Sequence, residues 1–365
     1  MAATFTDKLQ RLTPYEAGMG VDDARSRFAI DDVVKLASNE SPTPAHPDVI
    51  EAVRRAAAEG LNRYPEAGAT TLRKRIAERF ELEPGDVTVG NGSCDLLLAA
   101  AEALLEPGTE VVYAWPSFSM YPYLPGLSGA TEVRVPLDET WRHDLDAMAA
   151  AVGLDTRLVV VCNPNNPTGT YIQTPEIDAF VSALPDHVTV VLDEAYVEFQ
   201  ALEDPDASID LLKKHANLVV LRTFSKCYGL AGLRIGYALG SATLRSALDA
   251  VRQPFSVNHL AAVAGAEALR HGDDVIARVE RNLVERMTVE EALDDLEIDR
   301  ASSQANFSWF SVGSRDEAEV FQGLAERGII VRGGTGLGAE GHLRVTYGTR
   351  AENERFIEAL SALWR

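Results

Sequence analysis

Short runs of apolar residues, many of them β-branched, recur through the middle of the chain and are separated by longer stretches with helical character. These runs occupy residues 87–89, 159–162, 188–192 and 218–221. Each of them gives way to polar residues, glycine or proline, which is typical of a buried strand that ends in a turn. Because strand and helix signals alternate, the pattern predicts an α/β fold with a large doubly wound, mostly parallel sheet.

The same pattern predicts two domains. A large domain is expected over residues 40–250, and a smaller α+β domain is expected to combine residues 1–39 with residues 251–365. In the C-terminal part, we predict a helix over residues 274–296 and strands near residues 306–310 and 329–331. The chain contains no internal repeat, low-complexity tract or apolar run of transmembrane length. Its start lacks a basic-then-apolar signal, so the cytoplasm is the expected location.

Polar side chains follow three of the predicted strands at the point where each strand ends. Asn166 follows the first of them, Asp193 and Tyr196 follow the second, and Lys226 follows the third. In open parallel sheets, ligands collect outside the carboxyl ends of the strands. The four side chains are therefore predicted to meet in one site.

This set of side chains has a specific chemical logic. Lys226, one of six lysines, is placed like an amine that forms a Schiff base with an aldehyde cofactor, although a surface lysine on a loop would look similar. A buried aspartate such as Asp193 keeps a pyridine nitrogen protonated, and donors such as Asn166 and Tyr196 hold a pyridine 3-oxygen as an anion. An aspartate alone could equally bind a metal or cap a helix. All four groups in this order favour the cofactor site.

A phosphate anchor is predicted where a strand, a glycine turn and an apolar helix follow one another at residues 87–98. Backbone N–H groups of Ser93 and Cys94, at the start of the helix, would bind the anion. A simple tight turn would have the same residues, and the segment completes neither a dinucleotide fingerprint nor a P-loop. The hydroxyls of Thr223 and Ser225 and the guanidinium of Arg234 are expected to add to the anchor.

These residues resemble the fold-type-I pyridoxal-phosphate aminotransferases and, within them, the histidinol-phosphate aminotransferases. The resemblance covers nearly the whole chain. It is carried by residues 12–15, 36–40, 63–66, 90–93, 305–307, 331–332 and 343–349, besides the strand-end motifs around Asn166, Asp193 and Lys226. The segments Thr223-Phe224-Ser225-Lys226 and Asp193-Glu194-Ala195-Tyr196 are its most specific parts.

The resemblance implies pyridoxal 5'-phosphate as the cofactor and gives several residues a role toward it. Lys226 would bond to the cofactor and carry the proton between the substrate and the cofactor. Phe118 would stack on the pyridine face, although an ordinary core phenylalanine is an equal alternative. Tyr64 would reach the cofactor phosphate of a neighbouring subunit, so that a homodimer with shared active sites is expected. Cys94-Asp95 stands where the family usually has Asp-Glu, which leaves the role of the missing carboxylate open.

The resemblance also implies a substrate site and a reaction. Arg344 would bind the substrate carboxylate, Arg332 and Tyr15 would help to hold a substrate phosphate, and Asn166 would border both ligands. One pocket that accepts a phosphate and a carboxylate has a use for two arginines. The expected reaction is transamination between L-histidinol phosphate and 2-oxoglutarate in histidine synthesis. The alternatives are an aromatic or other amino-acid aminotransferase, a threonine-phosphate decarboxylase, and a binding module that has lost its chemistry.

Composition limits the remaining possibilities. Three widely separated cysteines and seven histidines without ligand spacing argue against a disulfide framework, a zinc site or metal catalysis. A formal net charge of −21 disfavours nucleic-acid binding. Such self-repulsion is tolerable where salt screens it, because the Debye length falls to roughly 3 Å at about 1 M ionic strength. We therefore expect a protein adapted to a salt-rich cytoplasm, the alternative being an ordinary acidic surface.

Overall fold

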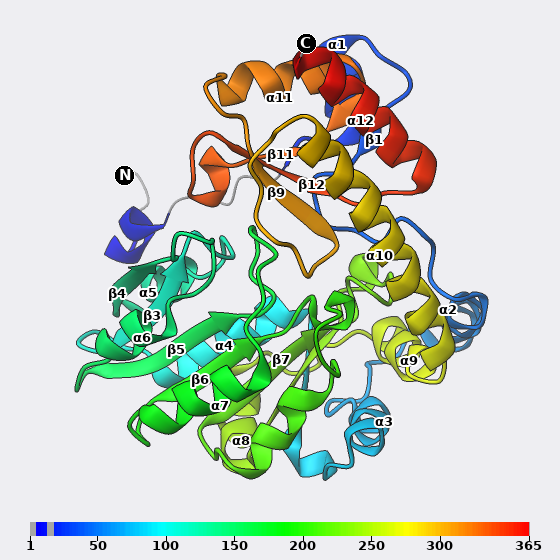
Figure 1. Cartoon of the computed structure of the whole chain (residues 1–365). Coiled ribbons are helices and arrows are strands. Elements are labelled where there is room, and N and C mark those ends of the chain that lie inside the picture. Colours follow the sequence, from blue (N-terminus) through cyan, green and yellow to red (C-terminus); the bar gives the residue numbers. More distant parts are fainter. Residues whose placement is uncertain (1–4, 13–17, 365) are drawn as a thin grey trace, which may run out of the picture.

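The computed structural model describes residues 5–12 and 18–364 (Figure 1). Its largest element is a seven-stranded sheet with the order β2-β8-β7-β6-β5-β3-β4. The strands are β2 Val87–Gly90, β3 Glu110–Trp115, β4 Thr131–Pro136, β5 Thr156–Cys162, β6 Thr189–Asp193, β7 Leu218–Thr223 and β8 Gly236–Gly240. Only β8 runs antiparallel to its neighbours, and every other pair in this sheet is parallel. The prediction of an α/β fold with a mostly parallel sheet is confirmed.

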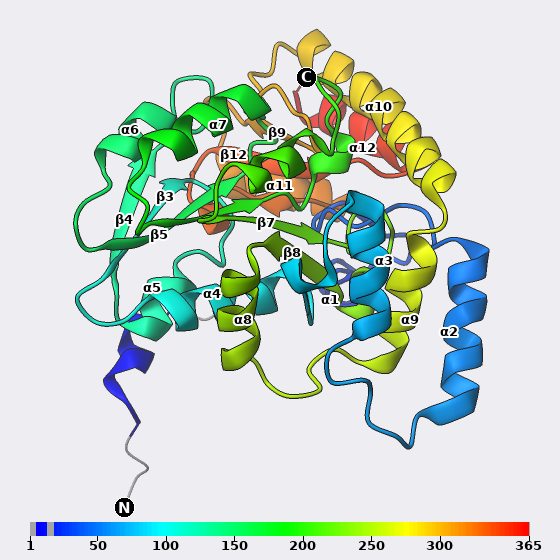
Figure 2. The same ribbon diagram turned by 90° about the horizontal axis from the view of Figure 1, so that it is seen from below.

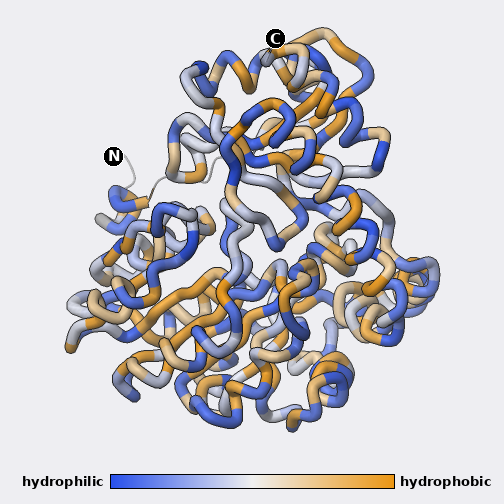
Figure 3. The backbone as a smooth tube through the Cα atoms, in the orientation of Figure 1, coloured by the Kyte–Doolittle hydropathy of each residue, from blue (hydrophilic) through white to orange (hydrophobic). Residues whose placement is uncertain are grey.

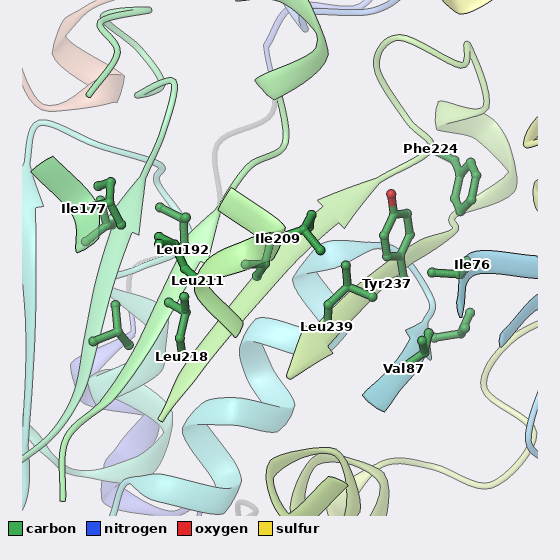
Figure 4. Packing of buried hydrophobic residues seen from close by; sticks show 14 of the residues in the cluster. Ile76, Val87, Ile177, Leu192, Ile209, Leu211, Leu218, Phe224, Tyr237 and Leu239 are labelled. Carbon is green, nitrogen blue, oxygen red and sulfur yellow. The ribbon is translucent and has the colours of Figure 1, made fainter. Parts of the chain in front are cut away.

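Both faces of this sheet are covered, which explains why its strands are continuously apolar. Along β5, Val159 and Val161 belong to one buried cluster, and Leu158 and Val160 belong to another, because successive side chains point to opposite faces. The first cluster, part of which Figure 4 shows, includes Ile76 and Ile177 from two covering helices. In Figure 3 the strands of the large sheet are mostly orange, whereas the helices around them alternate between orange and blue.

The covering helices fall into two layers. On the side of the first cluster lie α2 Pro47–Gly60, α3 Thr70–Phe80, α6 Leu145–Ala150, α7 Thr174–Ala183 and α9 His259–Ala268. On the other side lie α4 Ser93–Leu104, α5 Tyr123–Ser128 and α8 Ala242–Val251 (Figure 2). Short 3-10 helices are η1 Asp7–Arg11, η2 Pro84–Asp86, η3 Val197–Phe199, η4 Ala207–Lys213, η5 Ala231–Leu233 and η6 Thr335–Leu337.

A second, smaller unit lies against the end of the large sheet and joins the two ends of the chain. The N-terminal strand β1 Val34–Lys35 pairs in parallel with β10 Ile329–Ile330. Next to them is an antiparallel sheet of order β11-β12-β9, formed by β9 Phe307–Ser311, β11 Arg332–Gly333 and β12 His342–Thr346. Its helices are α1 Val21–Phe28, α10 Gly272–Asp295, α11 Glu317–Glu326 and α12 Arg350–Trp364.

The long helix α10 spans the region where a helix was predicted, and β9 and β10 lie where strands were predicted. One segment differs from the simple division at residue 250: α9 contributes Ala261 and Ala264 to the core of the large sheet. The exact domain boundaries stay a prediction. Within the described residues, no helix combines the length and the apolar character that a membrane span requires.

Candidate active site

A cavity of about 260 Å³ lies between the end of the large sheet and the smaller unit. It is lined by most of the side chains that the sequence singled out, namely Ser93, Cys94, Phe118, Asn166, Asp193, Tyr196, Thr223, Ser225, Lys226, Arg234, Arg332 and Arg344. Two further candidates are not in this list. Tyr64 lies elsewhere on the surface, and Tyr15 falls outside the described residues.

Lys226 follows β7 in a turn and is half-buried in the cavity wall. Its Nζ donates a hydrogen bond to the carbonyl oxygen of Ser38 at 3.2 Å and lies 5.6 Å from the ring centre of Tyr196. Burial lowers the pKa of Lys226 to about 8, and the positive charge of Arg344 acts in the same direction. The lowered pKa increases the fraction of neutral amine, which is the form that a nucleophile or a base needs.

Asp193, the last residue of β6, carries a buried carboxylate that is only partly hydrogen-bonded. Its Oδ2 accepts a hydrogen bond from the Tyr121 hydroxyl at 2.9 Å, whereas Oδ1 has no partner among the described residues. Burial raises the pKa of Asp193 to about 6, although the hydrogen bond from Tyr121 opposes the shift. A buried oxygen without a donor is costly, so this atom indicates a ligand that brings one.

Tyr121 was not singled out from the sequence. It is fully buried, and its ring meets that of Phe118 edge to face, with 5.8 Å between the centroids. The aromatic spacing of Phe118 and Tyr121 is compatible with an ordinary core. Only the fold, which brings Tyr121 beside Asp193, gives its hydroxyl a role.

Asn39 is a second residue whose role sequence reasoning missed, although it lies in one of the motifs that carried the resemblance. Its Nδ2 donates to the hydroxyl of Tyr196 at 3.0 Å, and its Oδ1 accepts from Thr346 Oγ1 at 3.1 Å. Burial raises the pKa of Tyr196, so the phenol stays protonated at neutral pH. The N-terminal segment therefore completes one wall of the cavity.

The two candidate arginines lie side by side because of a strand pairing. Arg332 on β11 and Arg344 on β12 are directly opposite each other in the antiparallel register, and both line the cavity. Arg344 donates to Asn166 Oδ1 at 2.5 Å and to the carbonyl oxygen of Ala37 at 2.7 Å. Two guanidinium groups at one wall suit a ligand with anionic groups.

Elsewhere in the same cavity, a set of donors surrounds the start of α4. Gly92 has φ +82°, and a Cβ atom at this position would lie 2.5 Å from Arg234 Nη2, so the turn needs glycine. Arg234 Nη1 also donates to Ser225 Oγ at 3.4 Å, and Thr223 donates to the same oxygen at 3.0 Å. A guanidinium, hydroxyls and the helix N-terminus at Ser93 form an anion-binding cradle.

Cys94-Asp95 differs from the residues that are usual in the family, but the carboxylate of Asp95 still supports this cradle. Asp95 Oδ2 accepts a hydrogen bond from the backbone N–H of Asn91 at 2.9 Å and pairs with Arg252 at 3.0 Å. Burial raises the pKa of the Cys94 thiol, which therefore stays uncharged at neutral pH. The glycine turn is thus held by Asp95 on its outer side.

The glycine-rich loop between β11 and β12 borders the same cavity. Its 3-10 helix η6 places Leu337 in the cavity wall. Glu317 on α11 anchors the loop by accepting hydrogen bonds from the backbone N–H groups of Thr335 at 3.0 Å and Gly341 at 2.8 Å. Leu337 therefore offers an apolar contact opposite the polar walls.

Tyr64 stands apart from these residues. It is 84% exposed and stacks on Phe255, with 4.9 Å between the ring centres. Its predicted contact with a cofactor in a neighbouring subunit is not tested by a single chain and stays a prediction.

Comparison with a family model matches residues 31–360 to aminotransferase class I and II. The curated histidinol-phosphate aminotransferase 2 of Pseudomonas fluorescens is 42% identical over 354 residues, which cover 96% of this chain and 95% of the relative. The histidinol-phosphate aminotransferase of Geobacillus thermodenitrificans is 39% identical over 359 residues, 98% of each chain.

Solved aminotransferase structures are also similar to this chain. Histidinol-phosphate aminotransferase from Sinorhizobium meliloti, in complex with pyridoxal-5'-phosphate, superposes with a TM-score of 0.89 at 27% identity, covering all of this chain and 98% of that one. A variant of Thermus thermophilus aspartate aminotransferase superposes with a TM-score of 0.87, also at 27% identity, over the full length of both chains.

Proposed function

The chain belongs to the class I and II aminotransferases, with histidinol-phosphate aminotransferases as its curated relatives, and on this premise we propose that it transfers an amino group between L-histidinol phosphate and 2-oxoglutarate. The products would be imidazole-acetol phosphate and L-glutamate, and the reaction belongs to histidine synthesis. The proposal rests on relatives with this printed name that match nearly the whole chain.

Pyridoxal 5'-phosphate is the cofactor that we propose, and the cavity fits it at both ends. The unpaired Oδ1 of Asp193 suits the N–H of a protonated pyridine, and the cradle of Ser93, Ser225 and Arg234 suits a phosphate. When bound, this cofactor supplies an electron sink for the electron pair that is left when a proton leaves the substrate α-carbon. Asp193, Asn166 and Tyr196 would hold its ring, and Phe118 would cover one face.

Lys226 would hold the cofactor and then carry the proton at the substrate α-carbon. With its pKa lowered to about 8, the fraction of neutral amine at pH 7 is about 300 times that of an ordinary lysine at 10.5. The nearby Ser38 carbonyl and Tyr196 ring orient the amine. A proton carrier works best when its pKa lies near the working pH, which is the condition that burial creates here.

Arg332 and Arg344 would bind the anionic groups of the two substrates in turn. L-glutamate brings two carboxylates and L-histidinol phosphate brings one phosphate, and two adjacent guanidinium groups can accept either arrangement. Leu337 would border the substrate side chain. Tyr15, outside the described residues, would assist with the phosphate.

The active unit that we propose is a homodimer. Tyr64 stacks on Phe255, which is 42% exposed, and Leu61, three residues before Tyr64, is 67% exposed. Clustered exposed apolar side chains are typical of a surface that another chain covers. In such a dimer, Tyr64 of each subunit would reach the cofactor phosphate in the other subunit. Dimer formation would therefore complete both sites.

We also propose that the enzyme is adapted to high salt. The net charge of −21 creates repulsion that salt at about 1 M screens beyond roughly 3 Å. The melting temperature is expected to rise steadily when KCl is added. Full stability in dilute buffer would contradict this part of the proposal.

The substrate is tested by half-reactions in which each amino donor is mixed with the holoenzyme and the cofactor absorbance is followed. L-histidinol phosphate should react with a much larger second-order rate constant than phenylalanine, tyrosine or threonine phosphate. A preference for an aromatic amino acid, or release of CO2 from threonine phosphate, would replace the proposed reaction by one of those activities.

A further inference from the structure

Outside the active site, two histidines and two carboxylates meet where the chain passes between the two units of the fold. His46 precedes α2, and Asp48 lies in the first turn of that helix. His271 lies between α9 and α10, and Glu267 is one turn before it on α9. None of these residues lines the active-site cavity. The contact therefore joins two segments that are distant in sequence.

The donor atoms of this cluster are spaced like ligands of one metal ion. One potential ligand atom from each of His46, Asp48 and His271 lies within 4.8 Å of those of the other two. Asp48 Oδ2 is 3.7 Å from His271 Nε2 and 3.9 Å from His46 Nδ1, and Glu267 Oε1 is 3.2 Å from His271 Nε2. Ligands of a tetrahedral ion with bonds of roughly 2.0–2.2 Å are about 3.4 Å apart.

We propose that His46, Asp48 and His271 bind a divalent transition-metal ion, with Glu267 available as a fourth ligand. Imidazole nitrogens with carboxylate oxygens suit Zn²⁺, Co²⁺, Ni²⁺ or Cu²⁺, whereas Mg²⁺ and Ca²⁺ prefer oxygen ligands alone. The sequence pattern did not reveal this set, because all strands of the large sheet lie between His46 and His271 along the chain. The proposal thus departs from the sequence-based expectation of no metal.

Binding requires a limited rearrangement of the histidine rings. The rings of His46 and His271 are stacked, with 3.8 Å between their centres and 19° between their planes. The nitrogen lone pairs lie in the ring planes, and these planes are nearly parallel. One imidazole must therefore turn about its Cβ–Cγ bond before both lone pairs can point at one ion. The side chains are 29% and 19% exposed, so neither ring is enclosed in the core. His46 Nδ1 would exchange its 3.2 Å hydrogen bond from the Asp48 N–H for the metal.

The site would join two passages of the chain between the units of the fold. The segment before His46 is held to α10 by Arg278, which donates to Thr43 Oγ1 at 3.0 Å and to the carbonyl oxygen of Pro44 at 2.5 Å. A metal between α2 and the start of α10 would add a second link beside this one. Since the ligands do not touch the active-site cavity, we expect the metal to change stability and not the chemistry.

Binding is measured on metal-free holoenzyme titrated with Co²⁺ in excess Mg²⁺, which occupies the general acidic surface. The visible d–d absorption of Co²⁺ reports nitrogen and oxygen ligands, and equilibrium dialysis with Zn²⁺ gives the stoichiometry. We expect one site per chain and a rise in melting temperature on saturation. The affinity should fall in each of the variants His46→Ala, His271→Ala and Asp48→Asn. The loss should be at least the roughly 10- to 100-fold that follows removal of a residue that only supports a ligand.

His215→Ala is the matched control. His215 also has a carboxylate neighbour, since its Nε2 lies 2.7 Å from Asp178 Oδ1, but no second histidine joins it in the described residues. This variant should retain the affinity and the spectrum. Binding that is unchanged in Asp48→Asn and His271→Ala, or wild-type binding no tighter than that of the double variant His46→Ala/His271→Ala, would overturn the proposal.

Discussion

Asp193 and Glu194 are adjacent in the chain, but they face two very different regions. Glu194 is fully buried and lies 2.9 Å from Nε and 2.8 Å from Nη2 of Arg222, whose Nη1 also binds Asp206 at 2.6 Å. Asp193 faces the cavity and keeps one oxygen without a partner in the described part of the chain. Burial raises the pKa of both carboxyl groups, but only Glu194 has a guanidinium in direct contact to oppose it.

This difference separates a structural charge from a functional one. A buried charge that is fully paired avoids the cost of an uncompensated charge and leaves nothing for a ligand. A buried charge left half-paired costs stability, and the fold keeps it where a ligand supplies the missing partner. Substitutions in the Asp193 region should therefore affect activity, and those in the Arg222 region should affect stability.

The largest effect is expected for Lys226→Ala. Loss of the proton carrier should lower kcat by at least about 10³-fold, in line with the 10²- to 10⁴-fold contribution of general acid–base groups plus the lost cofactor bond. The melting temperature should change little, because burial disfavours the charged amine. Steady-state kinetics and a thermal scan on one preparation measure both. Retention of a tenth of the activity would exclude Lys226 as the carrier.

Arg222→Met should give the opposite result. Removal of one partner from a buried ion pair leaves Glu194 uncompensated and is expected to cost about 3–5 kcal/mol of unfolding free energy. The protein that stays folded should keep most of its activity, because Arg222 does not line the cavity. Urea unfolding measures the stability, and the activity per amount of folded protein is measured separately. A large loss of kcat with unchanged stability would break the comparison.

The paired variant Arg222→Met/Glu194→Gln sharpens that test. Because both charges are removed together, most of the lost stability should return. If the double variant is as unstable as Arg222→Met alone, the contact with Asp206 or the packing of Arg222, and not its pairing with Glu194, stabilises this region.

The smallest effect is expected for Tyr121→Phe. Loss of one hydrogen bond to Asp193 should weaken cofactor binding by about tenfold, close to the 1.5 kcal/mol of a hydrogen bond to a charged group. The Tyr121 hydroxyl lowers the pKa of Asp193, so its removal should raise that pKa above about 6. The pH dependence of apoprotein stability measures the shift. An unchanged profile would mean that Tyr121 does not hold the carboxylate.

Much of the site could be predicted because it lies at strand ends. Asp193 directly follows an apolar run, Lys226 lies in the turn after another, and a parallel sheet brings such positions to one edge. Asn39 and Tyr121 could not be given roles, because they reach Tyr196 and Asp193 from 157 and 72 residues away. The same separation hid the cluster of His46 and His271. Local patterns predict the elements, whereas contacts between distant segments require the fold.

The central claim is that Asp193 is left half-paired for the cofactor, and one comparison tests it most directly. The unfolding free energies of wild type and Asp193→Asn are measured across pH 4 to 7, with and without saturating pyridoxal phosphate. Because the folded-state pKa of Asp193 is raised from 3.8 to about 6, the folded apoprotein binds more protons between these values. The contribution of Asp193 to stability is therefore lost as pH rises through this window.

At pH 7 the unfolding free energy of the Asp193→Asn apoprotein should equal or exceed that of wild type. A pKa shift of this size allows an increase of up to about 3 kcal/mol. Added cofactor should stabilise wild type much more than the variant, because only the carboxylate pairs with a protonated ring nitrogen. Two results would contradict the account. One is an Asp193→Asn apoprotein that is less stable than wild type at pH 7, and the other is a variant that the cofactor stabilises as much as it stabilises wild type.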